Sequence, residues 1–281
     1  MTQGYMILGM NATNSKTNII SAVALAKSIK KFDSEREVCV VVDKFSDVPK
    51  KHEEVFDYIV ELPFGRTDTD NNNLLENFWQ VYYCTPFDET IFINTYALVT
   101  ADPDSLWEVQ SLDDMVFFTT EDFTGSVGDT TKLTDTDDVE MQKLGGDVVY
   151  FKKSERAAEF FKMADPVFKN WRHVYRMYTD HIQYRDFNLS ILANLIATML
   201  GEQYHKSDNF SYIDLSQMPA SVNDGDDVDI NFWMDDKFEK VKVNNYSQHG
   251  IFVYHMPQLV DDKIMKVING NSTTKRTKQP A

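Results

Sequence analysis

The chain is poor in cysteine, with only Cys39 and Cys84 among its 281 residues. Cys39 lies in the apolar segment V-C-V-V-V and Cys84 follows an aromatic segment, so both are expected to be buried free thiols. The sequence has no disulfide framework and no C-x-x-C motif. This cysteine usage fits a reducing compartment, and we expect a cytoplasmic protein.

Long apolar runs and positive charge are also scarce. No stretch reaches the ~18 apolar residues of a membrane span, and the N-terminal segment M-T-Q-G-Y-M-I-L-G lacks the basic start of a signal peptide. Lys and Arg number 28 against 44 Asp and Glu, which gives a formal net charge of −16. That balance disfavours a broad face for duplex DNA, because nonspecific affinity comes from Lys and Arg that neutralise phosphates. It is compatible with a local basic groove. The positive residues at 275–278 lie in a tail, residues 271–281, that we expect to be disordered.

Strand and helix patterns alternate from the start of the chain. Residues 4–10 and 37–43 are short apolar runs typical of buried parallel strands. Between them, residues 18–32 carry apolar side chains at helical spacing, with Asn18 as the expected N-cap. This βαβ pattern predicts a Rossmann-like sheet, and at 42% hydrophobic content we expect one domain over residues 1–270. The G-x-G-x-x-G fingerprint is absent, which disfavours a nicotinamide dehydrogenase.

Further along, the expected elements are less regular. We expect strands at 55–62, 114–120 and 246–255, and helices at 74–83, 152–164 and 186–200. Residues 168–178 are both aromatic and basic. They are typical of an amphipathic helix, or of a surface that stacks on a sugar or base.

The stretch Glu89–Trp107 organises the rest of the chain. Thr90–Ile93 reads as a buried strand, and the polar tripeptide Asn94-Thr95-Tyr96 follows at its end. The tripeptide is followed by a second apolar run, a turn at residues 102–104 and the start of a helix. Ligands of open α/β folds collect at the carboxyl ends of strands, so the tripeptide is a candidate binding element.

This order of elements resembles the GT-A glycosyltransferases, in particular the glycogenin-like family 8 and its relatives in tailed phages. Those enzymes carry D-x-D where this chain has Asn94-Thr95-Tyr96. The resemblance covers residues 4 to about 265. Its individual motifs are loose, and the resemblance is based mainly on the order in which they occur. It implies an α/β fold, with a single GT-A (Rossmann-like) domain whose mainly parallel central sheet is flanked by helices. It also implies a glycosyltransferase that moves a sugar from a nucleotide-sugar donor, a UDP-sugar first, to an acceptor hydroxyl.

The resemblance also implies where the donor binds. The implied donor contacts are Asn11, Asp43, Arg66, Asn94 and Tyr96. Asn11 would contact the base or ribose, and Arg66 the diphosphate, since a guanidinium suits bidentate binding of phosphate. The residues alone also allow Asn11 to cap a loop, Asp43 to be a solvated turn residue, and Arg66 to be a solvated surface arginine.

Three later residues match the family near the sugar and the metal. Asp147 projects from the turn of L-G-G-D-V-V-Y-F, where a double glycine allows close backbone approach to a ligand. Asp186 opens an apolar helix and either lies near the sugar or caps that helix. The resemblance implies catalytic roles for both. His255, in N-Y-S-Q-H-G-I-F-V-Y-H, matches a histidine that holds the metal. All of these residues are expected to line one cleft.

The absence of the two D-x-D carboxylates affects the expected binding of a divalent metal ion. In such enzymes Mn²⁺ or Mg²⁺ stabilises the diphosphate, and both ions prefer oxygen ligands, above all carboxylates. Asn94 offers a neutral carbonyl oxygen and Tyr96 a protonated phenol, so we expect weakened metal binding.

Three interpretations stay open. The first is a glycosyltransferase with reduced metal need, and the second is an inactive GT-A-shaped protein that binds a nucleotide, a sugar or a protein partner. The third is a different Rossmann-like nucleotide-binding enzyme. The phage relatives suggest a modified DNA base or a glycan as acceptor, and the host cytoplasm as location if the protein is phage-encoded.

Overall fold

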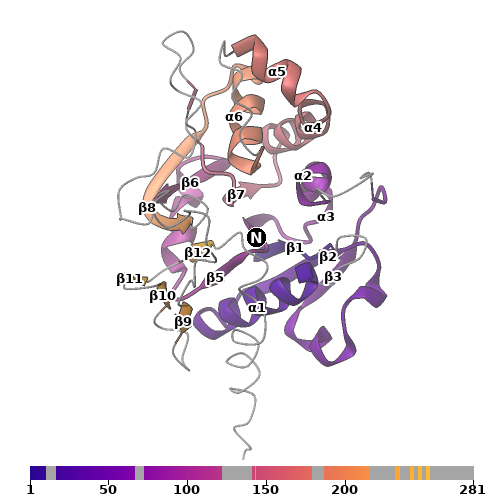
Figure 1. Ribbon diagram of the computed structural model, residues 1–281, viewed down its shortest axis with the longest axis vertical. Helices are drawn as coiled ribbons and strands as arrows, with labels where there is room; N and C mark the ends of the chain where they lie inside the picture. The colour runs from indigo at the N-terminus through magenta and orange to yellow at the C-terminus, as the bar shows by residue number, and fades with distance from the viewer. Residues whose placement is uncertain are drawn as a thin grey trace, which may run out of the picture.

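The computed structural model describes residues 1–10, 17–66, 73–121, 141–142, 144–178, 187–214, 232–234, 241–243, 246–248 and 251–253. Helices lie on both faces of a nine-stranded sheet, with α1 on one face and α2, α4 and α6 on the other (Figure 1). The strands of this sheet are β1 (Gln3–Leu8), β2 (Glu37–Val42), β3 (Tyr58–Glu61), β4 (Glu89–Ile93), β5 (Ala97–Val99), β6 (Met115–Glu121), β7 (Val148–Lys152), β8 (His205–Asp214) and β12 (Ile251–Val253). The helices are α1 (Thr17–Phe32), α2 (Asn73–Asn77), α3 (Val81–Cys84), α4 (Glu155–Lys169), α5 (Trp171–Tyr178) and α6 (Leu189–Leu200). Shorter 3₁₀ helices span Phe45–Asp47, Lys50–Val55, Phe78–Gln80 and Asp104–Ser111.

The strand order of the sheet is β3-β2-β1-β4-β7-β6-β8-β12-β5. Five of its pairings are parallel, and three are antiparallel: β4 with β7, β6 with β7, and β5 with β12. A second sheet joins β9 (Phe232–Met234), β10 (Val241–Val243) and β11 (Tyr246–Gln248). The predicted α/β fold with a mainly parallel central sheet is confirmed.

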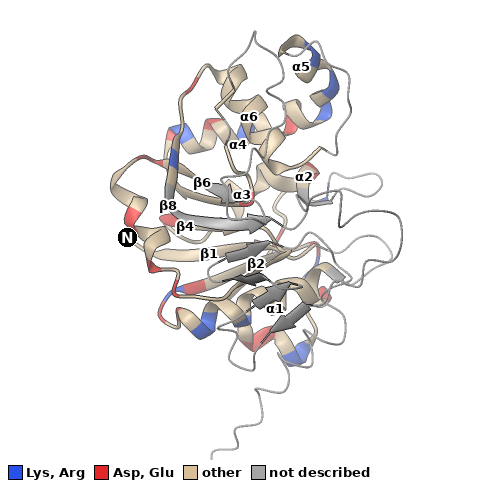
Figure 2. Ribbon diagram, turned by 60° about the vertical axis from the view of Figure 1, so that its left-hand side comes forward, with Lys and Arg blue, Asp and Glu red and all other residues tan. Residues whose placement is uncertain are grey.

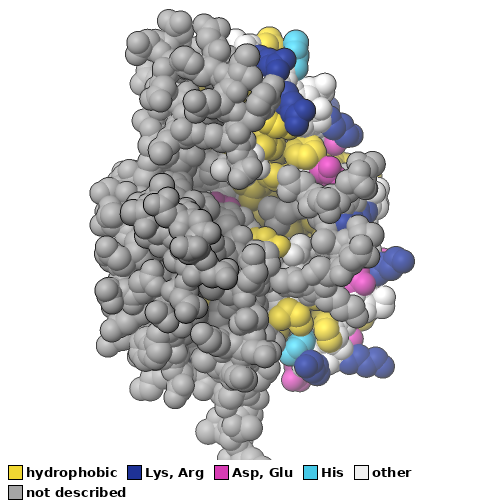
Figure 3. Space-filling view, in the orientation of Figure 1, with side chains coloured by type: hydrophobic (Ala, Val, Ile, Leu, Met, Phe, Trp, Pro, Cys, Tyr) yellow, Lys and Arg dark blue, Asp and Glu magenta, His cyan; other side chains and the backbone are white. Residues whose placement is uncertain are grey.

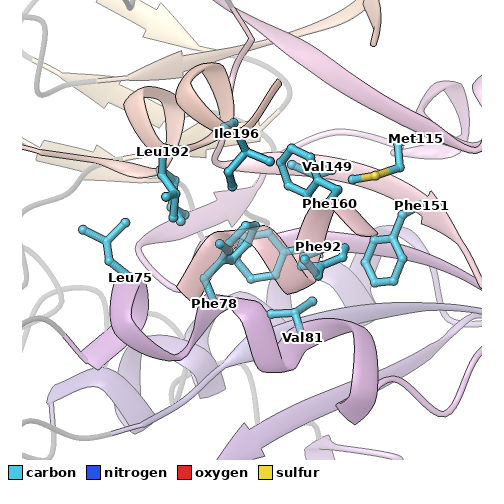
Figure 4. Packing of buried hydrophobic residues seen from close by; sticks show 14 of the residues in the cluster. Leu75, Phe78, Val81, Phe92, Met115, Val149, Phe151, Phe160, Leu192 and Ile196 are labelled. Atoms are coloured by element: carbon cyan, nitrogen blue, oxygen red, sulfur yellow. The ribbon is translucent and has the colours of Figure 1, made fainter. Parts of the chain in front are cut away.

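The core forms two layers because both faces of the sheet are covered. Successive residues of β1 alternate between them: Met6 and Leu8 join the cluster under α2, α4 and α6, whereas Tyr5 and Ile7 join the cluster under α1. Figure 4 shows the first cluster, where side chains of α2, α3, α4 and α6 meet those of β4, β6 and β7. A sheet buried on both faces explains why its strands read as continuous apolar runs.

Several expected boundaries were wrong. The chain at 50–55 is a 3₁₀ helix and β3 starts only at Tyr58, while the expected helix 74–83 is interrupted by the 3₁₀ turn Phe78–Gln80. The segment expected as one strand at 246–255 is divided between β11 and β12, which belong to different sheets. Likewise, α4 begins after the N-cap Ser154, because residues up to Lys152 complete β7. Within the described residues, no helix is both long and apolar enough to cross a membrane.

Candidate functional site

The carboxyl ends of four parallel strands gather polar side chains at one edge of the sheet. β1, β2, β3 and β4 run in the same direction, so Asp43 after β2 and Asn94 after β4 lie at the same edge. β7 runs antiparallel to β4, and Ile93 pairs with Val148. That direction brings Asp147, which precedes β7, to the same edge as Asn94.

Asn94 and Asp147 form a buried pair. The side-chain amide of Asn94 donates to Oδ1 of Asp147, and the backbone N–H of Asn94 donates to the carbonyl of Asp147 at 2.7 Å. Only 3% of Asn94 and 5% of Asp147 is exposed. A neutral amide therefore stands where a second buried carboxylate would repel the first.

The rest of the tripeptide closes a turn onto β1. Oδ1 of Asn94 accepts the backbone N–H of Tyr96 at 3.2 Å, as in an Asx-turn. The buried hydroxyl of Thr95 donates to the carbonyl of Leu8, the last residue of β1. The tripeptide thus joins the carboxyl ends of two neighbouring strands.

Tyr96 links this turn to the first turn of α1. Its hydroxyl donates to Oδ1 of Asn18 at 2.5 Å, and Nδ2 of Asn18 donates to the carbonyl of Met10 at 2.7 Å. Burial raises the pKa of the Tyr96 phenol, so it keeps the donated proton at neutral pH. Asn18 is not the N-cap we expected, because α1 already begins at Thr17.

Arg66 reaches the same edge from a turn after β3. Its guanidinium lies 3.3 Å from Oδ2 of Asp43, and a quarter of its side chain is exposed. Gln80 holds the turn: its Oε1 accepts the N–H of Phe64 at 3.2 Å, and its Nε2 donates to the carbonyl of Gly65 at 2.9 Å. Gly65 has φ +68°, a left-handed conformation that favours glycine.

The turn before Asp147 packs against the start of α6. The N–H of Gly146 donates to Oγ of Ser190 at 3.0 Å, and a Cβ at Gly146 would fall 2.3 Å from the carbonyl carbon of Leu189. Asn188 caps α6, since its side chain accepts the N–H of Ile191 at 2.9 Å. The backbone that approaches Gly146 closely is that of α6, and the close approach of a ligand to the double glycine stays a prediction.

Of the residues expected in one cleft, the structure pairs Arg66 with Asp43 and, separately, joins Asn94 to Tyr96 and Asp147, with both groups at the same edge of the sheet. One shared cleft stays a prediction. Asn11, Asp186 and His255 lie outside the described residues. The alternative in which Asp186 caps the helix was wrong, because that cap is Asn188.

Two supporting residues escaped the sequence interpretation. Asn18 was assigned to a cap, and Gln80 was not singled out. Gln80 is fully buried inside an aromatic helical segment, and a polar residue in such a segment was the available signal. No local pattern indicated that Asn18 would meet Tyr96, which is 78 positions away.

Among the described residues, the side-chain oxygens at this edge are poorly placed to ligate a divalent cation. Asp43 is paired with Arg66, and Oδ1 of Asn94 is turned to the N–H of Tyr96. Within the part of the chain that the structure describes, no three residues of His, Cys, Asp and Glu come together as a metal site. Beside Asn94 the described residues thus offer the carboxylate of Asp147 in place of the two carboxylates of a D-x-D motif, so they fit Mn²⁺ or Mg²⁺ poorly.

No protein-family model matches the sequence, and no curated protein matches it significantly. Solved structures match it in shape. The galactosyltransferase LgtC, in complex with donor and acceptor sugar analogues, aligns with a TM-score of 0.54 at 10% sequence identity, over 97% of this chain and 98% of LgtC. An active-site mutant of LgtC aligns with a TM-score of 0.50 at 12% identity, over 95% of each chain. At such identities the likeness concerns the fold, and the chain has the GT-A fold of glycosyltransferases.

Proposed function

We propose that this protein is a glycosyltransferase that moves a sugar from a nucleotide-sugar donor, a UDP-sugar first, to an acceptor hydroxyl. The observation that carries the proposal is the end-to-end likeness to LgtC, a galactosyltransferase bound to donor and acceptor sugar analogues. It is supported by the polar residues at the carboxyl edge of the sheet, where ligands of open α/β folds bind.

In this proposal the donor lies across that edge. Asp43 holds the guanidinium of Arg66 at 3.3 Å, and Arg66 neutralises the diphosphate through a bidentate contact. Asn11 contacts the base or ribose, and Lys16, in the same polar loop between β1 and α1, is a second cationic candidate for the phosphates; both lie outside the described residues. With cationic side chains on the diphosphate, binding needs Mn²⁺ or Mg²⁺ much less than it would with a D-x-D motif.

The sugar end of the donor is proposed to lie near Asp147 and Asp186. The carboxylate of Asp147 is fixed by the Asn94 amide, which suits a group that orients sugar hydroxyls. His255 stays the proposed contact for a divalent cation. The described strand that leads to it, β12, ends at Val253, which pairs with Ala97.

Binding is tested first. A thermal-shift screen of nucleotides and nucleotide-sugars should find a ligand, because a ligand at 100 times its Kd stabilises the folded state by about 2.7 kcal/mol. Calorimetry of UDP binding, with EDTA and with Mn²⁺, should then give similar affinities.

Arg66→Ala should weaken binding at least tenfold, with Arg66→Lys intermediate and Arg172→Ala unchanged as a control away from the edge. Absence of any nucleotide binding would refute the proposal, and loss of binding in EDTA would refute the reduced metal need.

A second candidate is a GT-A-shaped protein that binds a nucleotide or sugar without catalysis. The hydrogen bonds of Asn94, which stands at the first position of the D-x-D motif, favour this candidate. Both polar side-chain atoms of Asn94 are already hydrogen-bonded to protein groups. Donor hydrolysis separates the two candidates: release of UDP from the bound donor supports the transferase, and tight binding without release supports the inactive protein.

A further inference from the structure

A groove of about 510 Å³ lies where α4 turns into α5, facing α2. Its α4–α5 wall consists of Phe168, Lys169, Asn170, Trp171, Arg172 and His173. Glu76 of α2 lines the opposite side. The volume lies within the range of about 300–1,000 Å³ of small-molecule sites, so one or two sugar rings could enter.

The charge of the groove differs from that of the chain. Three exposed basic side chains, Lys169, Arg172 and His173, line it, although the chain carries a net charge of −16. Lys169 is paired with Asp165 at 2.8 Å, and Glu76 is the acidic side chain among the lining residues. Figure 2 shows Lys and Arg along α5, and Figure 3 shows them beside a histidine and hydrophobic side chains at the upper right. A local positive surface on an acidic protein favours an anionic ligand.

The floor of the groove is aromatic and well supported. The ring of Trp171 stacks on that of Phe187 with centroids 4.6 Å apart, and the ring centroid of Phe168 lies 5.9 Å from that of Phe187. The guanidinium of Arg172 lies 5.4 Å from the centre of the Trp171 ring. Asn170 is fixed as well, because its side chain donates to the carbonyl of Pro166 at 2.9 Å. Aromatic surface with a few placed polar groups is typical of small-molecule sites, and it suits the apolar faces and hydroxyls of a sugar ring.

The groove is joined to the carboxyl edge by one short segment. Phe187, which supports Trp171, lies two residues before α6. The first residues of α6, Leu189 and Ser190, pack on Gly146, next to Asp147. A ligand in the groove therefore binds beside the segment that supports the proposed sugar-transfer site.

We propose that this groove binds an anionic saccharide, a sugar that carries a phosphate or a carboxylate, as the acceptor. Its identity as acceptor rests on the proposed function, whereas the binding of an anionic sugar does not. The basic side chains hold the anionic group, and Asn170 and the aromatic floor hold the ring. This chemistry favours a glycan over a DNA base as the acceptor.

Ligand-detected NMR tests the proposal with glucose 6-phosphate, glucuronate, glucose and inorganic phosphate as probes. Glucose 6-phosphate and glucuronate should each bind at least tenfold more tightly than glucose. Glucose 6-phosphate should also bind at least tenfold more tightly than inorganic phosphate, because both parts of the ligand contribute. The double variant R172A/H173A should weaken binding of the anionic sugars at least tenfold, and E76Q should leave it unchanged or strengthen it. K162A removes an exposed lysine of α4 outside the groove and is the matched charge control.

The outcomes are separable. Phosphate binding as tight as glucose 6-phosphate, or unchanged binding in R172A/H173A, would overturn the proposal. Competition by a duplex oligonucleotide at lower concentration than the sugars would overturn it in favour of nucleic acid. UDP calorimetry on the same variants should be unchanged, so a failure of nucleotide binding would contradict the proposed transferase while leaving the groove as an anionic-sugar site.

Discussion

The side-chain amide of Asn94 donates to the carboxylate of Asp147, and the backbone N–H of Asn94 donates to the carbonyl of the same residue. Two strands that run in opposite directions, β4 and β7, meet at this pair. Because both residues are almost fully buried, the pair requires one neutral and one acidic side chain. This requirement explains why an amide is acceptable at the first position of the tripeptide.

N94D should destabilise the fold at neutral pH by about 1–3 kcal/mol, because the donated hydrogen bond is replaced by repulsion between buried carboxylates. Repulsion raises the pKa of the introduced carboxyl, so the protonated form fits the folded state better. The deficit should therefore shrink as the pH falls from 7.5 towards 4.5. Thermal unfolding of N94D and wild type across this range measures it.

The control for this prediction exchanges the two groups. The double variant N94D/D147N restores one acid and one amide, and it should recover most of the stability lost in N94D at pH 7.5. A deficit in N94D that does not change with pH, or no recovery in the double variant, would contradict the pairing.

Tyr96→Phe should lower the free energy of unfolding by about 0.5–1.5 kcal/mol, the usual contribution of a hydrogen bond. Asn18→Ala should cost more, because the Asn18 side chain also bonds to the carbonyl of Met10. The two losses should be less than additive in the double variant, since one hydrogen bond is removed by either change. A double-mutant cycle from chemical denaturation measures the coupling, and strict additivity would show that the two side chains do not interact.

Gly146→Ala should destabilise by about 1–3 kcal/mol, because the added methyl overlaps backbone atoms of Leu189 and Ser190 and the start of α6 must shift. Gly201→Ala is the comparison: Gly201 has φ +66° with open space around it, so its cost of about 1 kcal/mol comes from backbone strain alone. Only Gly146→Ala should also weaken binding of the intact nucleotide-sugar, through the neighbouring Asp147, which is proposed to lie at the sugar end of the donor. Equal effects of both variants on nucleotide-sugar binding would contradict this link.

Both thiols should resist alkylation in the native protein. Burial raises the pKa of Cys84 to about 12 and that of Cys39 far above its ordinary value, so the reactive thiolate is scarce at pH 8. Iodoacetamide followed by mass spectrometry should find no modified cysteine before unfolding and two after it. Rapid labelling of either thiol in the folded protein would show that the core opens at that residue.

The sequence alone determined the elements whose signals are local. Apolar runs predicted β1, β2, β4 and β6, and the polar tripeptide follows the end of β4 as expected. Its role as a binding element stays a prediction. The same local patterns placed α1 and α6 to within a few residues. Each of these signals lies in one segment, where periodicity and burial act on neighbouring residues.

Only the tertiary structure decided which of these residues meet. Asn94 and Asp147, 53 positions apart, form a pair because β7 runs antiparallel to β4, and no local pattern encodes the direction of a strand. The roles of Asn18 and Gln80 were likewise set by partners in other segments, Tyr96 and the turn at Gly65. Hydrogen bonds between distant segments depend on strand order and direction, which arise from the packing of the whole sheet and its helices.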